Sequence, residues 1–277
     1  MKTIVHLSDI HFGKFDPKHT KPLLAAINKI HPHLIIISGD LTQRARLAEF
    51  QLAKEFLAEL KSPYLVIPGN HDIHPEYKPL ARLMKPYSRY LRYISRDLEP
   101  TFVDDEIVVA SINTVRATTI KNGRISWDQI KKAWEFLSEH NSGRLKIVVT
   151  HHPFDLPREL PDMPLAGRAK TAVKAFSLAG VDMYLSGHLH HSSVVETAER
   201  HKIEGYSAIA VQAGTVSIRL RSFQDDVPEG QSFNVIIVNK PVVTVTTYSW
   251  NQGKSEFREI SKTKFSSAQT GLWQLKH

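Results

Sequence analysis

The sequence contains no cysteine among its 277 residues. Disulfide bonds and thiolate metal sites are therefore excluded, so any bound metal must be held by nitrogen and oxygen donors. No apolar run approaches the roughly 18 residues that a membrane-spanning helix needs. The opening residues MKTIVHLSDIH reach His6 and Asp9 before the apolar core of a secretory signal could form. We therefore expect a cytoplasmic protein.

Acidic residues are in the minority, with 28 Asp and Glu against 36 Lys and Arg, and the formal net charge is +8. A solvated basic surface explains this charge, and so does attraction of an anionic substrate, a lipid surface or nucleic acid. Basic residues are spread along much of the chain, so the charge alone does not choose among these explanations. The length and the hydrophobic content of 42% suit one large globular domain or two small ones.

The first two-thirds of the chain alternates short apolar runs with helical patterns. This alternation favours βαβ units and a sheet that helices cover on both faces. The pattern changes at Val194, from which successive β runs predict a second sheet or half-sheet. We expect a single domain over residues 1–262 and a loosely ordered, polar C-terminal tail over 263–277. The predicted strands are 3–8, 34–38, 64–68, 106–114, 145–150 and 182–186, and the predicted helices are 22–30, 46–60, 126–140 and 168–178.

Residues 73–98 interrupt this alternation with a basic, aromatic segment of helical character that contains three prolines. The segment directly follows the sequence PGNHD, so we predict a small helical flap beside a functional site. Arg89 and Arg92 are its candidate substrate-binding residues. A plain pair of surface helices explains the same pattern almost as well.

Asp, His and Asn side chains follow five of the apolar runs, in the motifs SDIH, SGD, PGNHD, THH and SGHLH. Because residues just past the ends of parallel strands converge at one edge of a sheet, we expect these side chains to form one site. Each motif alone has an ordinary explanation, such as a helix cap or a turn. The five together predict a binuclear metal site. The seven candidate ligands are Asp9, His11, Asp40, Asn70, His151, His188 and His190.

The residue types of this set suit phosphoryl transfer. Two cations about 3.5–4 Å apart can clamp the attacking and leaving oxygens of a phosphoryl group and lower the pKa of bound water. Histidine and carboxylate donors bind zinc, manganese and iron. The expected cofactor is therefore two metal ions per chain, Mn, Fe or Zn.

The set DIH, GDLT, GNHD, HHP and GHLH resembles the calcineurin-like metallophosphoesterase superfamily and is most similar to bacterial class III cyclic-nucleotide phosphodiesterases. The resemblance implies an α/β fold, a two-sheet β-sandwich flanked by helices on both sides (α/β/β/α). The chain departs from the GDxxDRG and GNHE motifs of protein serine/threonine phosphatases, because it has GDLTQRA and GNHD at these places.

The resemblance also implies a role for each residue of the site. His71 would assist the leaving group while a metal-bound hydroxide attacks phosphorus, and Asp72 would orient His71. Asp40 would bridge the two metals. The first metal would be held by Asp9, His11, Asp40 and His190, and the second by Asp40, Asn70, His151 and His188.

The leading prediction is hydrolysis of a small phosphodiester, a cyclic nucleotide or a similar molecule, with no stable nucleic-acid complex. One alternative is a nucleotide-sugar lipid pyrophosphate hydrolase at the membrane surface, in which the basic aromatic flap makes peripheral membrane contact. Those enzymes usually replace the histidine of GNHD, whereas His71 is present here. Another alternative is an inactive scaffold of the same fold, although such proteins lose ligands that this chain retains. The oligomeric state stays open.

Four further residues are weaker candidates. His152 could line the pocket, but a structural role before Pro153 explains it equally well. Asn113 follows an apolar run and could lie near the site. Arg219 and Arg221 could reach a phosphate group, and a salt bridge within a loop is at least as good an explanation.

Overall fold

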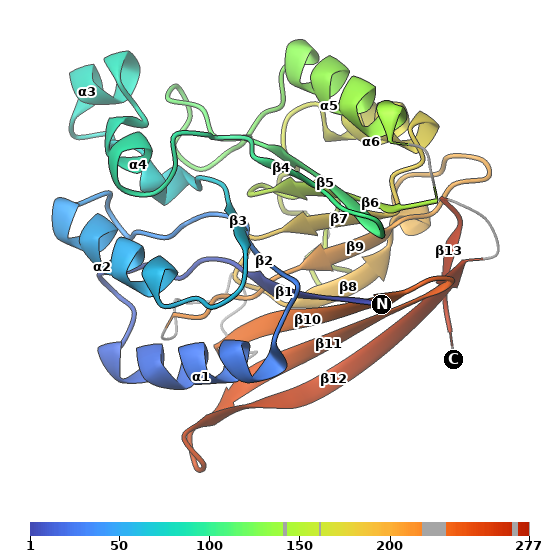
Figure 1. Cartoon of the computed structure of the whole chain (residues 1–277). Helices are drawn as coiled ribbons and strands as arrows, with labels where there is room; N and C mark the ends of the chain where they lie inside the picture. Colours follow the sequence, from blue (N-terminus) through green and yellow to red (C-terminus); the bar gives the residue numbers. More distant parts are fainter. Residues whose placement is uncertain (141–142, 161, 218–230, 268–270, 277) are drawn as a thin grey trace.

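The fold is a four-layer sandwich in which two β-sheets face each other and helices cover both outer faces (Figure 1). This computed structural model describes residues 1–276 with the exception of 141–142, 161, 218–230 and 268–270. The architecture confirms the predicted α/β fold with a two-sheet β-sandwich flanked by helices. Arg219 and Arg221 lie outside the described residues.

The first sheet has seven strands in the order β13-β12-β11-β10-β1-β2-β3. The strands β1, β2 and β3 are parallel, and the remaining pairs are antiparallel. Its strands are β1 (Lys2–Leu7), β2 (Leu34–Ile37), β3 (Tyr64–Val66), β10 (Ser232–Asn239), β11 (Val242–Asn251), β12 (Glu256–Ser267) and β13 (Trp273–Leu275).

The second sheet has six strands in the order β4-β5-β6-β7-β9-β8, with β5, β6, β7 and β9 parallel. Its strands are β4 (Thr101–Val103), β5 (Ile107–Ile112), β6 (Leu145–Thr150), β7 (Met183–Ser186), β8 (Ser193–Glu196) and β9 (Ile209–Gln212). The prediction that a second sheet begins at Val194 was wrong, because the chain changes sheets between β3 and β4. The later strands β10 to β13 return to the first sheet, where β10 pairs antiparallel with β1.

Three apolar clusters hold the layers together. Ile4 and Ile36 face the other sheet, whereas their neighbours Val5 and Ile37 face the helices α1 and α2. Successive side chains of a strand point to opposite faces, so a strand buried on both faces needs the continuous apolar run that β2 has. A third cluster lies between the second sheet and the helices α5 and α6. The long helices are α1 (Thr20–Ile30), α2 (Leu47–Ala58), α5 (Trp127–Glu139) and α6 (Ala169–Leu178).

The predicted helix over 126–140 is confirmed as α5, and it begins at a capping box formed by Ser126 and Gln129. The Ser126 hydroxyl accepts a hydrogen bond from the backbone N–H of Gln129 at 3.2 Å, and the Gln129 side-chain oxygen accepts one from the Ser126 N–H at 2.9 Å. The two bonds satisfy backbone donors that have no partner inside the helix. They fix the point at which α5 begins.

The C-terminal residues are part of the first sheet, so the prediction of a loosely ordered tail over 263–277 was wrong for the residues that the structure describes. Phe265 on β12 and Trp273 on β13 are each 1% exposed, and the Trp273 indole N–H donates to Asp182 Oδ1 at 2.8 Å. Lysines and serines occupy the alternate, outward positions of β12. They gave this strand a polar composition that concealed its apolar inner face.

The segment 73–98 forms two short helices, α3 (Pro79–Met84) and α4 (Ser88–Tyr93), at one corner of the molecule (Figure 1). The Arg89 guanidinium donates to the backbone carbonyl of Ala45 at 2.5 Å. This bond ties α4 to the loop after β2, so Arg89 has a structural contact that the sequence did not predict. The short 3-10 helices are η1 (Pro17–His19), η2 (Asn70–Asp72) and η3 (Thr197–Glu199). None of the helices in the described ranges is long and apolar enough to cross a bilayer.

Candidate metal centre

The seven candidate ligands follow the carboxyl ends of five parallel strands. Asp9 comes two residues after β1 and Asp40 three residues after β2, while Asn70 opens η2 beyond β3. In the other sheet, His151 follows β6 directly and His188 follows β7 at two residues. The two sheets therefore present their ligands at one edge of the sandwich, as parallel strands generally do.

The backbone at this edge is held in an unusual conformation. Five of the nine described non-glycine residues with positive φ are candidate ligands: Asp9, His11, Asp40, His188 and His190, with φ between 52° and 76°. Non-glycine residues adopt such angles rarely and at a cost of about 1–2 kcal/mol each. Strain of this kind concentrates at functional sites, where the surrounding structure enforces it. Here it turns side chains from separate strands toward a common point.

Asp9, His11 and His190 form the first donor group. The Nε2 atoms of His11 and His190 are 3.1 Å apart, and they lie 3.6 Å and 3.1 Å from Asp9 Oδ1. Three donor atoms of one buried cluster thus lie within the reach of a single ion. Asp9 Oδ1 is buried and close to both imidazoles, but it accepts no well-aligned hydrogen bond from any residue that the structure describes. A buried carboxylate oxygen without a donor is costly, and a cation removes that cost.

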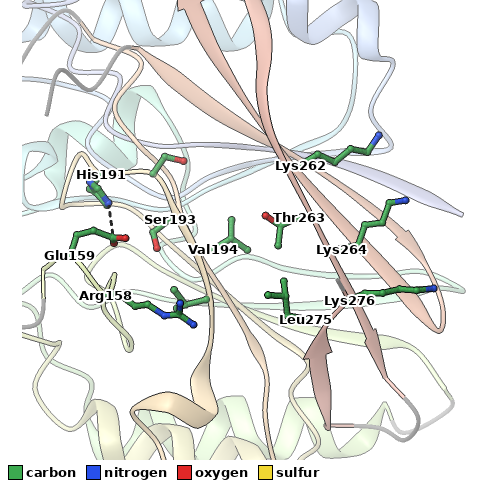
Figure 2. A pocket seen from close by; sticks show the side chains of 12 residues that line it. Arg158, Glu159, His191, Ser193, Val194, Lys262, Thr263, Lys264, Leu275 and Lys276 are labelled. Carbon is green, nitrogen blue, oxygen red and sulfur yellow. Dashed lines mark ion pairs between the residues drawn. The ribbon is translucent and has the colours of Figure 1, made fainter.

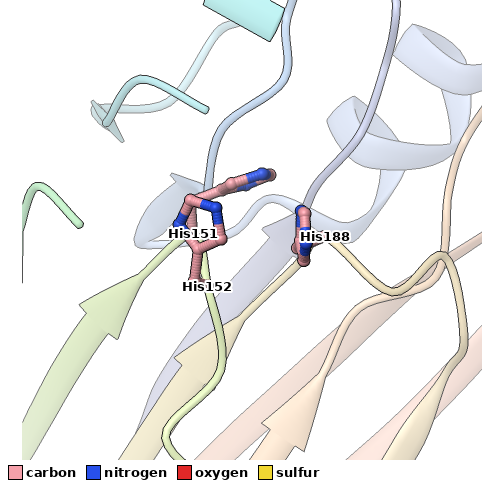
Figure 3. Close-up of side chains that lie close together, drawn as sticks. All are labelled: His151, His152 and His188. Carbon is pink, nitrogen blue, oxygen red and sulfur yellow. The ribbon is translucent and has the colours of Figure 1, made fainter. Parts of the chain in front are cut away.

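Asp40, Asn70 and His151 lie together as a second donor group, and His188 lies beside His151. His151 Nε2 lies 3.4 Å from Asp40 Oδ2 and 3.1 Å from the side-chain oxygen of Asn70. The His151 and His188 rings approach edge-on, with centroids 5.1 Å apart (Figure 3). This group combines carboxylate, amide and imidazole donors, which fit a divalent or trivalent cation of intermediate hardness.

Asp40 connects the two groups. Its Oδ2 atom lies 3.4 Å from His151 Nε2 in the second group and 3.8 Å from His11 Nε2 in the first. One carboxylate oxygen is thus placed between the donor histidines of both groups. A carboxylate in this position could serve both donor groups.

Backbone groups fix which atom of each ligand faces the centre. Asp40 Oδ1 accepts the N–H of His71 at 2.8 Å, and Asp9 Oδ2 accepts the N–H of His188 at 2.8 Å, so each carboxylate keeps its other oxygen for the centre. His151 Nδ1 donates to the Ser38 carbonyl at 2.8 Å, which directs Nε2 inward. Partners of this kind orient metal ligands in general and fix the tautomer of histidine.

The electrostatics of the centre favour a cation. Burial opposes ionisation of Asp40, but His151, His71 and His11 together hold the pKa of that carboxyl far below its ordinary value. Burial likewise opposes the charged form of His151, yet the Asp40 carboxylate raises the pKa of this imidazole to about 9. In the first group, burial opposes ionisation of Asp9, while His190 and His11 hold the pKa of Asp9 well below the ordinary value. Both buried carboxylates are therefore ionised, and positive charge on the neighbouring imidazoles or on a bound cation stabilises them.

His152 lies close enough to His151 and His188 to share a metal ion with them, but its ring nitrogens are engaged elsewhere. Its ring is 4.5 Å from that of His188 between centroids (Figure 3). However, its Nδ1 atom is 2.8 Å from the Thr114 hydroxyl, and its Nε2 atom is 2.8 Å from the Lys121 carbonyl. Both ring nitrogens are thus hydrogen-bonded, which favours the structural role over the pocket-lining one. Asn113 also has a local role, since its side-chain oxygen accepts the N–H of Val115 at 3.0 Å.

His71 and Asp72 differ from their predicted relationship. The His71 Nδ1 atom is 2.7 Å from the carbonyl of Gln43. The Asp72 carboxylate instead accepts the backbone N–H groups of Leu41, Thr42 and Gly69 at 2.8 to 3.1 Å. Asp72 therefore fastens the SGDLT loop to the PGNHD loop. The Gln43 carbonyl, instead of Asp72, orients the imidazole of His71.

Glycines in two of the motifs leave no room for a side chain. A Cβ atom on Gly69 would lie 2.0 Å from Asp40 Oδ1, and one on Gly187 would lie 2.5 Å from Asp9 Oδ2. Both contacts are far shorter than van der Waals distance. The two loops can approach the ligands Asp40 and Asp9 closely because these positions are glycine.

Sequence reasoning missed two side chains that support the centre from the strand β9 and the loop after it. The Thr215 hydroxyl donates to the Asp9 carbonyl at 2.7 Å, and the Gln212 amide donates to the Gly187 carbonyl. The available signal was the sequence AIAVQAGT, where polar residues follow an apolar run as they do in the five ligand motifs. Gln43 left no such signal, because it acts through its backbone carbonyl.

Two cavities of similar size lie on the surface. One of about 450 Å³ opens onto Asn70 and His71, and its wall includes Tyr77 from the flap and Lys121. The other, about 470 Å³, lies between β8 and the strands β12 and β13 (Figure 2). It contains none of the candidate ligands, so the first cavity is the substrate entrance that the geometry favours.

Converging carboxylate and imidazole donors of this kind are typical of metal-dependent hydrolases that act on phosphate esters. Comparison with known proteins agrees with this class of enzyme. The chain belongs to the calcineurin-like phosphoesterase family, whose sequence model matches residues 2–192. It is therefore a metal-dependent phosphoric ester hydrolase, and it has the His and Asp groups that could hold metal.

The curated relatives include two bacterial proteins. The chain is 23% identical over 200 residues to a probable cyclic nucleotide phosphodiesterase of Xenorhabdus bovienii, covering 68% of this chain and 78% of that protein. It is 25% identical over 205 residues to the 3',5'-cyclic adenosine monophosphate phosphodiesterase of Escherichia coli K12, covering 68% of this chain and 69% of that one.

Solved structures agree with the fold. A dimetal phosphatase from Danio rerio superposes with a TM-score of 0.63 at 11% identity, covering 94% of this chain and 98% of that one. A purple acid phosphatase from yellow lupin (Lupinus luteus) superposes with a TM-score of 0.64 at 13% identity. The match covers 96% of this chain but 53% of the lupin chain, so this protein spans about half of that enzyme.

Proposed function

We propose that this protein is a binuclear metal-dependent phosphodiester hydrolase. The observation that carries the proposal is the position of Asp40 Oδ2, 3.8 Å from His11 Nε2 and 3.4 Å from His151 Nε2. In this proposal Asp40 is shared between two cations. The first is completed by Asp9, His11 and His190, and the second by Asn70, His151 and His188.

Two bound cations would supply charge neutralisation at the phosphoryl oxygens and a nucleophilic water near neutral pH. The protein's contribution is to hold the ligands in place. The backbone N–H groups of His71 and His188 each hold one oxygen of Asp40 and Asp9 at 2.8 Å. The ligands are therefore in position before substrate arrives, which reduces the reorganisation that the reaction needs.

His71 is the proposed general acid. Its Nδ1 atom is hydrogen-bonded to Gln43, so Nε2 is the atom that can transfer a proton to the departing oxygen. The residue lines the 450 Å³ cavity, and its ring centroid is 5.0 Å from that of His11. His71 is thus close to the donor groups but is not one of the ligands.

The cationic side chains nearest the cavity differ in how free they are to bind phosphate: Arg82 and Arg116 are held by neighbouring groups, whereas Arg44 and Lys121, which line the cavity, are exposed. A phosphodiester carries one negative charge, whereas a monoester near neutral pH carries close to two. Arg82 lines the cavity, but its guanidinium donates to three backbone carbonyls. Arg116 is similarly occupied by Asn113, Val115 and Gln129. Similarity to the cyclic-nucleotide phosphodiesterases points to a cyclic nucleotide or a related small diester.

A hydrolysis panel with manganese-reconstituted protein tests this proposal. The panel contains cyclic nucleotides, bis-p-nitrophenyl phosphate, p-nitrophenyl phosphate and a nucleotide-sugar lipid. We expect diester hydrolysis to exceed monoester hydrolysis, with the Asp40→Ala variant as a control for contaminating phosphatases. A monoester rate well above that of every diester would contradict the proposal.

The nucleotide-sugar lipid is included because of a second candidate function, a lipid-linked pyrophosphate hydrolase. The observation that favours it is the exposure of Leu80 and Met84 on α3, each 75%, beside the cavity. Preferential cleavage of the lipid substrate would select this function.

A further inference from the structure

The helix α3 in the flap has its polar and apolar faces reversed. Leu80, Leu83 and Met84 are 75%, 62% and 75% exposed, while Arg82 in the same helix is 6% exposed. Residues spaced three and four apart lie on one face of a helix, so the three apolar side chains form a continuous stripe. A surface helix normally turns this stripe toward the core.

Arg82 explains how the reversed orientation is held. Its guanidinium donates to the carbonyls of His74, Ala117 and Thr119 at 2.6, 2.9 and 2.5 Å. These bonds anchor α3 both to the start of the flap and to the neighbouring loop 116–121. The apolar stripe faces outward because the buried face of α3 is occupied by this charged anchor. The exposure is therefore a built feature of the fold.

Two further exposed apolar side chains belong to the flap and the loop that Arg82 anchors. Tyr77 and Ile120 are 63% and 57% exposed, and both line the 450 Å³ cavity that contains His71. We call the five side chains together the apolar ridge; its members are Tyr77, Leu80, Leu83, Met84 and Ile120. Two members of the ridge therefore line the cavity that contains His71.

The charges around the apolar ridge are positive. Lys78 and Lys85 flank α3, Lys121 follows Ile120, and all three are exposed. Glu76 is the only acidic residue in the sequence between positions 73 and 96. Exposed apolar side chains beside lysines combine the two attractions that peripheral proteins use on anionic membranes, insertion between acyl chains and attraction to headgroups.

We propose that the apolar ridge docks on the surface of an anionic lipid bilayer and places the entrance of the active-site cavity against it. A second copy of the chain fits less well, because a contact between two identical ridges would bring lysines against lysines. The inference does not depend on which phosphate ester is hydrolysed, so it can succeed or fail independently of the proposed function.

Sedimentation with lipid vesicles tests the proposal. The wild-type chain should sediment with vesicles of phosphatidylcholine and phosphatidylglycerol more than with phosphatidylcholine alone, and added salt should weaken binding. The double variant Leu83→Ser/Met84→Ser should reduce partitioning by about tenfold or more, since it removes two inserting side chains. The double variant Lys78→Ala/Lys85→Ala should remove most of the preference for anionic lipid.

Matched controls come from α6, on the other sheet. Leu178 is 81% exposed, so Leu178→Ser removes a comparable apolar side chain, and Lys170→Ala/Lys174→Ala removes two exposed charges. Both controls should bind vesicles like the wild type. All variants should hydrolyse bis-p-nitrophenyl phosphate normally without vesicles, because none of the substituted residues lines the 450 Å³ cavity.

Three results would overturn the proposal. The first is a wild-type chain that does not sediment with anionic vesicles. The second is a loss of vesicle binding in the α6 controls as large as in the ridge variants, which would indicate attraction by the overall charge of +8. The third is a wild-type dimer that Leu83→Ser/Met84→Ser converts to monomer, which would make the ridge a self-interface.

Discussion

His71 is fixed at one ring nitrogen by a backbone carbonyl. The Nδ1 atom lies 2.7 Å from the Gln43 carbonyl, and the His71 N–H donates to Asp40 Oδ1. A proton on Nδ1 suits this bond, so the other nitrogen is left for chemistry. The same residue therefore positions the shared carboxylate through its backbone and serves the substrate through its side chain.

Replacing His71 by alanine should separate catalysis from metal binding. The His71→Ala variant keeps the backbone N–H that holds Asp40, so its metal content should match the wild type. Turnover should fall by about 10²–10⁴-fold, the usual contribution of general acid–base catalysis. The loss of turnover should be smaller for bis-p-nitrophenyl phosphate than for a diester with a poor leaving group, because nitrophenolate leaves without a proton. Steady-state kinetics and metal analysis measure both effects.

The exposed His31 provides a control, and His31→Ala should leave turnover unchanged. If the turnover of His71→Ala fell by the same factor for substrates with good and with poor leaving groups, the role of His71 as an acid would be excluded. His71 would then act on the phosphoryl oxygens.

The gathering of the candidate ligands at one edge was predictable from the sequence, because each is a polar side chain placed just after an apolar run. Their orientation was not accessible. Asp72 was predicted to orient His71, but its carboxylate is used by backbone N–H groups of two loops, and Gln43 holds the imidazole. Backbone donors and acceptors have the same chemistry at every residue, so a sequence does not reveal which of them acts.

The turn after β3 depends on close contact with Asp40. Gly69 has φ −101°, which any residue can adopt, but a Cβ atom there would lie 2.0 Å from Asp40 Oδ1 and 2.3 Å from its backbone nitrogen. The Gly69→Ala substitution should therefore displace Asp40 without straining its own backbone. We expect loss of metal and of nearly all activity, measured by elemental analysis and diester hydrolysis.

Gly205 gives the complementary control. Its φ of +69° disfavours other residues, but nothing lies within 4 Å of an added Cβ atom. Gly205→Ala should cost about 1 kcal/mol of stability from backbone strain and keep the metal. Full metal content and activity in Gly69→Ala would show that the loop can move aside.

The short strand β13 should contribute strongly to stability. Trp273 is 1% exposed and donates to Asp182, so Trp273→Ala should lower the free energy of unfolding by about 3–5 kcal/mol. Leu275 in the same strand is 42% exposed, and Leu275→Ala should change the free energy of unfolding by about 0.5 kcal/mol or less. Urea unfolding measures both. Similar small effects from the two substitutions would mean that β13 is not part of the stable sheet.

Elements with strong local patterns were predictable. The buried strand β2 and the helix α5 have the apolar run and the capping box that define them, and both were located correctly. The sheet to which each strand belongs was not predictable. The pairing of β10 with β1 joins residues more than 200 positions apart, such as Val5 and Val235, and no local pattern encodes that register.

The two sheets each contribute part of the candidate centre. Asp9, Asp40 and Asn70 follow strands of the first sheet, while His151 and His188 follow strands of the second. Each donor group combines ligands from both sheets, so the distances within a group depend on the apolar cluster that packs the sheets against each other. Interiors pack densely and deform little, so this cluster holds the ligands of the two sheets at fixed distances.

The proposal of a shared, binuclear centre is tested most directly by the metal content of Asp40→Ala. After reconstitution with manganese, elemental analysis of the wild type should approach two ions per chain. Asp40→Ala should lose both ions or nearly so, because the substitution removes a ligand from each donor group. Asp128→Ala, at an exposed position in α5, should keep both. One ion per wild-type chain, with the same content in Asp40→Ala, would contradict the account.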